Sequence, residues 1–406
     1  MVNIAILGYG TVGSGVVEVL NINGSSVINK RAGEEINVKY ILDLRDFPGT
    51  PIEHKIVHDF DVILNDDDIK IVVEVMGGVE PAYTFVKAAL LKGKSVCTSN
   101  KELVAKHGAE LLEIAKQNNI NFLFEASVGG GIPIIRPLNQ SLTADEIQEI
   151  TGILNGTTNY ILTKMGREGL DFDTVLKEAQ AKGFAERNPD ADVLGYDACR
   201  KIAILSSLAF GHQVDFEDIY TEGITKITDV DFKYAKQLDS SIKLFASSKK
   251  TGDSFYAMVA PVLVNSYHPL YSVNDVLNGI YIKGNVIGDV MFVGAGAGKL
   301  PTASAVVSDV VDAVKHLGRN IMTNWSSKKL ELTHIDKSEK QYFVRISGNV
   351  SDRLKEVEEV FGEVKVVEVP GVTGEFGIVT KVMSEETYKA KAQSLDGILN
   401  MIRIEG

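Results

Sequence analysis

The sequence predicts an α/β protein built in three regions, and three observations support this. Over residues 1–130, short apolar runs alternate with segments of helical periodicity, which is typical of a Rossmann-type, doubly wound parallel sheet. Past residue 140 the pattern is that of a mixed α+β domain. The tail follows the strand–helix–strand–strand–helix–strand order of a ferredoxin-like unit. We therefore expect domains at 1–130, completed by about 300–325, at 131–300 and at 341–406.

The first region alternates regularly between the two kinds of element. Its expected strands are Asn3–Leu7, Val38–Leu42, Ile71–Val75, Ser95–Thr98 and Asn121–Phe124, and its expected helices are Thr11–Leu20, Pro81–Lys92 and Lys101–Asn118. In the second region we expect strands at Glu146–Leu154 and Phe255–Val264, and helices at Asn159–Glu168, Asp173–Lys182, Tyr196–Phe210 and Thr302–Leu317. The second region should form a mixed α+β domain built on one sheet.

The tail should be separable, because the polar stretch Asn324–Lys340 links it to the rest. Its expected elements are Gln341–Ser347, Asp352–Phe361, Val364–Val369, Gly374–Met383, Glu385–Ser394 and Ile398–Ile404. The middle four are helix, strand, strand and helix, and the outer two are strands.

Composition excludes several classes of protein. The net charge of −12 argues against nucleic acid and anionic membranes as partners. There is no apolar run long enough to span a bilayer, and the start of the chain runs straight into a strand, so we expect a cytoplasmic protein. Cys97 and Cys199 form no disulfide framework. The seven histidines show no ligand spacing, which argues against a catalytic transition metal.

A glycine-rich turn follows the first expected strand and opens the first expected helix. It reads Gly8-Tyr9-Gly10-Thr11-Val12-Gly13. Gly8 permits the tight turn, Gly10 lets a pyrophosphate approach the backbone, and Gly13 allows helix and strand to pack closely. The helix N-terminus adds free amides and a partial positive charge. This context predicts dinucleotide binding.

The sequence leaves the choice between NAD and NADP open. The second expected strand ends near Asp43, which would bind a ribose hydroxyl, and near Arg45, which would attract a 2′-phosphate. A second glycine cluster, Gly294–Leu300, fails the P-loop pattern because Leu300 replaces the Ser or Thr. It is either a flexible turn or another backbone bend that approaches the cofactor at a helix N-terminus.

The stretch Gly183–Lys201 carries four carboxylates and a lysine in a loop that runs into a helix. Asp197 and Lys201 are four residues apart and therefore share one helix face. A solvated ion pair is the simplest interpretation of such a pair. The apolar continuation Ile202–Phe210 favours a working pair instead, because charges beside a buried helix are costly unless paired or functional.

Three further stretches lie at expected strand ends. Lys101 begins a helix, where its charge opposes the dipole, which favours a functional lysine. Glu125–Pro133 reads as a hinge, although its carbonyls could bind a hard cation. Ile153–Tyr160 offers Thr157, Thr158 or Asn159 either as a helix cap or as donors to a small carboxylate.

These blocks together resemble homoserine dehydrogenase over about residues 1–325, most specifically at Gly183–Lys201, Ile153–Ile161 and Glu125–Pro133. The resemblance implies NAD(P)H-dependent reduction of L-aspartate 4-semialdehyde to L-homoserine, on the route to threonine and methionine. It also implies a nucleotide-binding domain, a substrate and dimerisation domain, and a homodimer or higher homo-oligomer.

The resemblance assigns roles by position. Lys201 matches the general acid/base lysine, Lys101 a second lysine beside the nicotinamide, and Asp197 and Glu186 the residues that hold homoserine. Residues matching cofactor contacts are Thr11, Val12, Ser99, Lys101, Gly183 and Gly298, beside Gly8, Gly10 and Gly13 of the turn. Residues matching a Na⁺ site, bound largely through backbone carbonyls, are Glu125, Val128, Gly130 and Ile132.

The chain departs from the family at two places. Leu194 stands where a polar residue, often Glu, is common. The tail resembles an ACT domain but has Gly348–Asp352 where such domains often carry an Asp-x-Pro-Gly turn, so we expect the fold without a threonine site. Pairing with another tail is the alternative role.

Two other functions compete with this interpretation. An acyl-transferring semialdehyde dehydrogenase would need a cysteine nucleophile, but Cys199 faces away from the Asp197–Lys201 pair. A non-catalytic regulator that binds a dinucleotide and an amino acid would have no need of a proton donor.

Overall fold

The computed structural model describes residues 1–405, and contacts within the chain divide it into two compact units. Unit 1 comprises Met1–Glu146, Ala203–Phe216 and Gly294–Leu330. Unit 2 comprises Ile147–Ile202, Glu217–Val293 and the described residues from Glu331 onward.

Unit 1 is built on a six-stranded sheet in which every adjacent pair is parallel, as predicted. In sheet order the strands are β3 (Ile56–Val57), β2 (Ile36–Leu42), β1 (Val2–Leu7), β4 (Ile69–Glu74), β5 (Ser95–Thr98) and β6 (Phe122–Leu123). The order reverses between β1 and β4, and open sheets of this kind bind ligands at such a switch point. Only the short β3 was not predicted.

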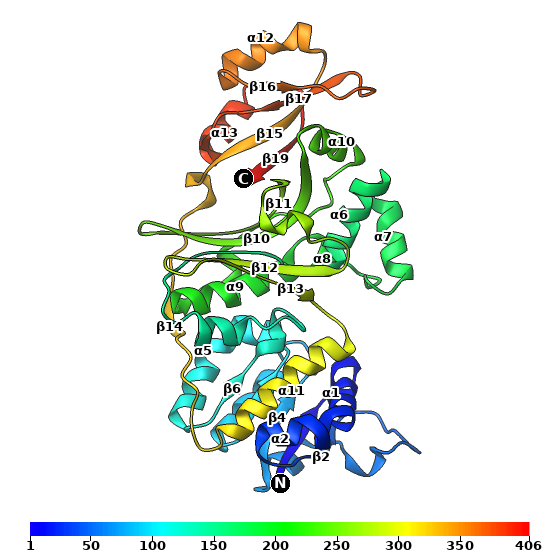
Figure 1. Ribbon diagram of the computed structural model, residues 1–406, viewed down its shortest axis with the longest axis vertical. Helices are drawn as coiled ribbons and strands as arrows, with labels where there is room; N and C mark the ends of the chain where they lie inside the picture. The colour runs from blue at the N-terminus through cyan, green and yellow to red at the C-terminus, as the bar shows by residue number, and fades with distance from the viewer. Residues whose placement is uncertain (406) are drawn as a thin grey trace. The chain divides into compact units, whose positions relative to one another are not determined.

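Helices join the parallel strands and pack on the sheet (Figure 1). They are α1 (Thr11–Asn23), α2 (Asn29–Ala32), α3 (Phe60–Leu64), α4 (Ala82–Leu91), α5 (Lys101–Gln117) and, far along the chain, α11 (Lys299–Lys315). Helix α11 packs closely on α1, because a Cβ at Gly15 would lie only 2.8 Å from the Lys299 oxygen. Val306 and Val310 of α11 lie in one core with Ile4 and Val16.

Unit 2 is organised by one sheet, as expected of the second region, and this sheet has eleven strands with both parallel and antiparallel pairs. Its main path is β13 (Gly288–Ala295), β12 (Leu277–Gly284), β7 (Ile147–Ile153), β10 (Ser240–Thr251), β11 (Ser254–Asn265), β19 (Ile398–Glu405), β15 (Glu339–Ser347), β17 (Glu375–Val379) and β16 (Lys365–Val367). The short strands β9 (Tyr220–Thr221) and β18 (Met383–Ser384) pair with β11 and β15. Strands β9, β10, β12 and β13 were not predicted.

Four helices of unit 2 lie close to their predicted positions: α6 (Gly156–Glu168), α7 (Phe172–Ala181), α12 (Val350–Phe361) and α13 (Glu385–Ala392). Two further helices, α8 (Asp190–Val193) and α10 (Asp229–Gln237), were not predicted. Helix α9 (Tyr196–Phe210) has the predicted bounds and is assigned to unit 2 as far as Ile202.

The tail has the predicted order of elements, with β18 added, and its contacts within the chain group it with unit 2. Strand β19 pairs in parallel with β11, through Val262 with Arg403 and Leu263 with Ile404. Val262 and Leu263 are almost completely buried, so an uncovered edge of β11 would expose both apolar side chains and unpaired backbone groups. The tail therefore extends the sheet of the second region. Two short elements, β14 (Ser326–Lys329) and a 3-10 turn at Ile335–Lys337, occupy the polar link.

Within residues 1–405, no helix is long and apolar enough to cross a membrane.

Candidate active site

The glycine turn lies at the carboxyl end of β1 and has the geometry that the sequence predicted. Gly8 has φ +94°, a conformation that favours glycine. A Cβ at Gly13 would lie 2.0 Å from the Gly8 oxygen, so only glycine permits this approach of helix to turn. Gly10 is the N-cap of α1 and supplies no side chain to its first turn. The amides that begin at Thr11 and Val12 therefore remain available to an anionic ligand.

Asp43 and Arg45 pair with each other beside this turn. The Arg45 guanidinium donates to both Asp43 oxygens at 2.9 Å, and the amide of Tyr9 donates to the same carboxylate at 2.8 Å. The bonds from Arg45 hold the pKa of Asp43 well below its usual range. Because the two charges balance, the end of β2 beside the glycine turn carries neither a bare carboxylate nor a bare cation.

A buried hydrogen-bonded network holds the ends of β4 and β5 together. Glu74 accepts from the Thr98 hydroxyl at 2.6 Å and from the Met76 amide at 2.8 Å, and burial raises the pKa of Glu74. The Thr98 hydroxyl in turn accepts from the Asn100 amide, and Asn100 caps α5 through the Leu103 amide at 3.1 Å. The network thereby fixes the backbone around Ser99 and Lys101. We missed Glu74 in the sequence, although a carboxylate ending an otherwise apolar strand is a usable signal.

The Asp197–Lys201 pair forms as predicted, and it is buried. Lys201 Nζ lies 2.9 Å from Asp197 Oδ2 and donates to the Leu154 main-chain oxygen at 2.8 Å. Lys201 is 8% exposed and Asp197 is 5% exposed. A solvated surface pair would be far more open, so the simpler interpretation of this stretch is wrong.

Asn155 connects this pair to α6. Its Nδ2 donates to Asp197 at 2.9 Å and to Asp192 at 2.7 Å, while its Oδ1 accepts from the Thr158 amide and caps the helix. Our prediction that Thr157, Thr158 or Asn159 would be the cap is wrong, because α6 begins earlier, at Gly156.

The three alternative cap residues are engaged elsewhere and do not converge on one ligand. Thr157 donates to the Phe184 oxygen at 2.6 Å, Thr158 to the Asn155 oxygen at 3.1 Å, and Asn159 to the Leu277 oxygen at 3.0 Å. The idea that these side chains together receive a small carboxylate therefore finds no support in their geometry.

The loop before α8 presents the other expected contacts. Gly183 has φ +73°, and the Glu186 side chain is exposed. Leu194 ends α8 and is partly buried.

Cys199 is buried, and burial raises the pKa of its thiol, which disfavours the thiolate that an acyl-transfer mechanism would need.

The crossover at Glu125 is held together by hydrogen bonds from main-chain amides to the Glu125 side chain. Both Glu125 carboxylate oxygens are occupied, since they accept from the amides of Ile134, Ile135 and Arg136 at 2.5–2.8 Å. The side chain of Glu125 is therefore committed to the backbone and not to a metal.

The four expected sodium ligands keep their main-chain oxygens unengaged. Within residues 1–405, no hydrogen bond is found to the oxygens of Glu125, Val128, Gly130 and Ile132. A Cβ at Gly129 would lie 2.4 Å from the Ile132 oxygen. In the same part of the chain, no cluster of three or more His, Cys, Asp or Glu side chains could hold a metal.

The second glycine cluster lies against this crossover. Gly130 has φ +58°, and a Cβ there would lie 2.3 Å from the Gly296 oxygen, while the Gly131 amide donates to the Ala295 oxygen at 3.0 Å. Gly298 is the N-cap of α11 and adds no side chain there. The cluster is thus a defined bend at a helix N-terminus, and its approach to the cofactor stays a prediction.

A parallel sheet with a glycine turn at its switch point and a buried lysine–aspartate pair define a nucleotide-dependent oxidoreductase. The family model described as homoserine dehydrogenase matches residues 133–311, and the model of the NAD binding domain of homoserine dehydrogenase matches residues 8–125. A homoserine dehydrogenase of Synechocystis is 44% identical over 386 residues, covering 93% of this chain and 86% of its own. The chain belongs to the homoserine dehydrogenase family, and it is an NAD(P)-dependent oxidoreductase.

Other relatives agree with this assignment. A homoserine dehydrogenase of Bacillus subtilis is 42% identical over 330 residues, covering 80% of this chain and 75% of its own. The crystal structure of a homoserine dehydrogenase from Thiobacillus denitrificans superposes with a TM-score of 0.90 at 34% identity, covering 100% of this chain and 98% of that one. A hyperthermophilic archaeal homoserine dehydrogenase in complex with NADPH superposes with a TM-score of 0.66 at 31% identity, covering 77% of this chain and 97% of that one.

Proposed function

We propose that this chain reduces L-aspartate 4-semialdehyde to L-homoserine and that Lys201 supplies the proton. The buried Lys201–Asp197 pair is the observation that carries this assignment. When bound, the nicotinamide would supply the hydride that the aldehyde carbon takes up. The carbonyl oxygen then becomes an alkoxide, which takes a proton from Lys201 Nζ to give the alcohol.

The remaining site residues would position the substrate and balance its charge. Asp197 and the Leu154 oxygen accept from Lys201 Nζ and so fix its direction. Glu186, which is exposed on its loop, would pair with the substrate ammonium group. Lys101 would add positive charge near the developing alkoxide and stabilise it.

The cofactor is NAD or NADP. We propose that it lies on the glycine turn, with its pyrophosphate at the first amides of α1 and with Ser99, Lys101, Gly183 and Gly298 as further contacts. A relative was solved in complex with NADPH, which supports a nicotinamide dinucleotide as the cofactor. The Asp43–Arg45 pair is suited to either form of the ribose, since Arg45 could turn from Asp43 toward a 2′-phosphate.

Several finer assignments follow from the family. We propose that Na⁺ is held by the main-chain oxygens of Glu125, Val128, Gly130 and Ile132, supported by the absence of other partners to these oxygens within residues 1–405. A hard monovalent cation prefers such neutral oxygen ligands. We also propose a cytoplasmic homo-oligomer, an ACT-like fold for the tail, and domains at 1–130 (completed by about 300–325), 131–300 and 341–406.

The decisive experiment compares wild type with Lys201→Ala. We expect the variant to lose about 10²- to 10⁴-fold in kcat, the usual contribution of a positioned proton donor, with little change in the Kd for NADPH. Oxidation of NADPH and NADH is followed with L-aspartate 4-semialdehyde added last, and Lys226→Ala, an exposed lysine of the same unit, is the control. A Lys201→Ala enzyme that keeps most of its turnover would remove Lys201 from this role. Cofactor binding without turnover in the wild type would favour the non-catalytic regulator.

A further inference from the structure

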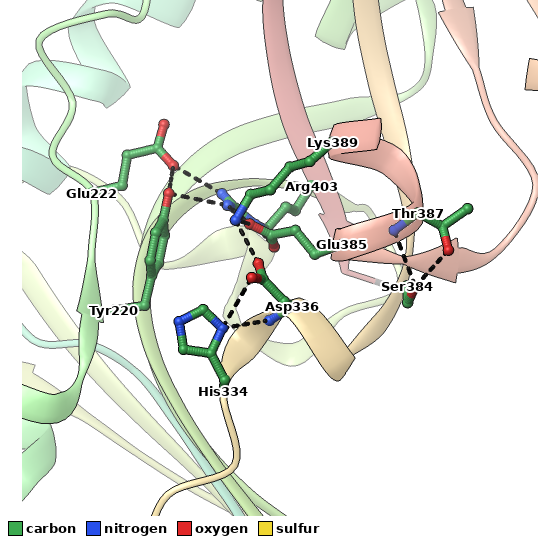
Figure 2. Close-up of polar contacts among 9 residues, drawn as sticks. All are labelled: Tyr220, Glu222, His334, Asp336, Ser384, Glu385, Thr387, Lys389 and Arg403. Atoms are coloured by element: carbon green, nitrogen blue, oxygen red, sulfur yellow. Dashed lines mark hydrogen bonds and ion pairs between the residues drawn. The ribbon is translucent and has the colours of Figure 1, made fainter. Parts of the chain in front are cut away.

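A buried cluster of charges joins the C-terminal segment to the second region (Figure 2). At its centre is Arg403 of β19, which is 1% exposed. Its guanidinium donates to both oxygens of Glu385, at 2.8 and 2.7 Å, and to Glu222 at 2.9 Å. It also lies over the Tyr220 ring, 5.0 Å from the centroid. Arg403 therefore links Glu385, the first residue of α13, to Tyr220 and Glu222 at strand β9.

The residues after Glu222 pack directly on the turn Val193–Gly195, which precedes α9, the helix that carries Asp197 and Lys201. The Ile224 amide donates to the Val193 oxygen at 2.9 Å. A Cβ at Gly223 would lie 2.1 Å from that same oxygen, so the two backbones are in close contact. The segment Glu222–Ile224 thus packs against the end of α8.

The turn itself has little freedom to move. Gly195 has φ +85°, and a Cβ there would lie 3.1 Å from Val259 and 3.2 Å from Thr221. Two residues later, Asp197 binds Lys201. A displacement of the Glu222 segment would therefore pass to the backbone that sets the position of Asp197.

We propose that Arg403 is a positioning residue for the Asp197–Lys201 pair, acting through Glu222 and the segment Glu222–Ile224 on the turn at Val193–Gly195. This rests on the proposed role of Lys201. The C-terminal segment then helps to hold α9 in place. A substitution that shifts β19 or α13 should therefore change kcat.

Glu222 is the residue through which this can be tested without unfolding the chain. In Glu222→Ala the buried guanidinium keeps both oxygens of Glu385, so no charge is left without a partner. We expect kcat to fall about 10-fold, within the range of couplings between separate sites, while the Kd for NADPH stays unchanged. Glu222→Gln retains the length and an oxygen for Arg403, and it should recover most of kcat.

The matched control is Lys389→Met. Lys389 pairs with Glu385 and Asp336 of the same cluster, and its Nζ lies 5.8 Å from the centroid of the Tyr220 ring. Within residues 1–405, no ion pair joins Lys389 to Glu222 (Figure 2). Its removal should change kcat by no more than about twofold, as for an ordinary surface substitution. If Lys389→Met lowers kcat as much as Glu222→Ala does, general loosening is the cause and the proposal is wrong.

A double-mutant cycle tests the link from Arg403 itself. Arg403→Lys keeps a positive charge for Glu385 but lacks the fork that reaches Glu222. Its loss of kcat should match that of Glu222→Ala, and the double variant should fall no further. Additive losses in the double variant would overturn the proposed route.

Hydrogen exchange separates this proposal from the role of Lys201. In Glu222→Ala, the amides of residues 190–202 should exchange about 10-fold faster than in the wild type. In Lys389→Met, the same amides should exchange at the wild-type rate. This readout does not depend on turnover. Unchanged exchange and unchanged kcat in Glu222→Ala would refute the positioning role even if Lys201→Ala is inactive, and faster exchange would support it even if Lys201→Ala proves active.

Discussion

Replacing Asn155 with alanine removes one side chain that performs three tasks. Asn155 caps α6 through the Thr158 amide, and it donates to Asp192 and to Asp197. The cap orders the helix, and the bond to Asp197 holds the carboxylate that Lys201 binds. The variant should therefore affect both stability and turnover.

The size of the effect follows from the three bonds. Loss of the cap costs about 1 kcal/mol. A hydrogen bond to a carboxylate contributes about 1.5–3 kcal/mol. Asp192 is only partly buried, and Asp197 retains its ion pair with Lys201. We therefore assign the two bonds to carboxylates the free energy of one full hydrogen bond. We expect the free energy of unfolding to fall by about 3 kcal/mol and kcat to fall about 10- to 100-fold through misplacement of Asp197.

Urea denaturation and steady-state kinetics measure the two effects separately. Asn155→Ser is the informative comparison, because serine is a good helix cap but cannot donate to both carboxylates. It should recover about 1 kcal/mol of stability and little of kcat. An Asn155→Ala enzyme with wild-type kcat would show that Asp197 does not need this bond, and the reasoning about the pair would fail.

Two further predictions concern other parts of the chain. Gly13→Ala places a Cβ 2.0 Å from the Gly8 oxygen, so the Kd for NADPH measured by titration calorimetry should rise at least about 10-fold, whereas Gly24→Ala, in open space, should leave it unchanged. Burial disfavours the charged form of Glu405, but Lys340 and Lys249 outweigh it and lower the pKa of Glu405 to about 2. A lowered carboxyl pKa stabilises the fold above the free value near 4.5 and loses this effect as pH falls toward 2. The difference in unfolding free energy between wild type and Glu405→Gln should therefore shrink by about 2 kcal/mol from pH 6 to pH 3, and a constant difference would contradict this.

Much of the fold follows from local pattern. The strand Ser95–Thr98 and the helix Tyr196–Phe210 have the predicted bounds, because each is a run of clear apolar periodicity ended by polar or glycine residues. Strand β10 was missed because its sequence, with Ser240 and Ser241 at one end and Lys249 and Lys250 at the other, lacks a continuous apolar run. It is a strand because it pairs with β11 along its whole length.

The candidate site divides in the same way. The glycine turn and the four-residue spacing of Asp197 and Lys201 could be recognised, since both depend on neighbours in the chain. Asn155 could not be identified as the link between Asp192 and Asp197, because the two carboxylates lie 37 and 42 residues away. The same holds for the Glu74–Thr98 bond, which joins two strands 24 residues apart.

The sequence by itself determined the class of protein, the parallel sheet with its glycine turn, and the face that Asp197 and Lys201 share, because all of these are written in short-range periodicity and in residue types with narrow conformational preferences. Only the tertiary structure decided that the pair is buried against the Leu154 oxygen, that Asn155 holds it, and that the tail continues the sheet and reaches Glu222 through Arg403. Burial and long-range pairing depend on which surfaces meet when the chain closes, and no local pattern specifies that.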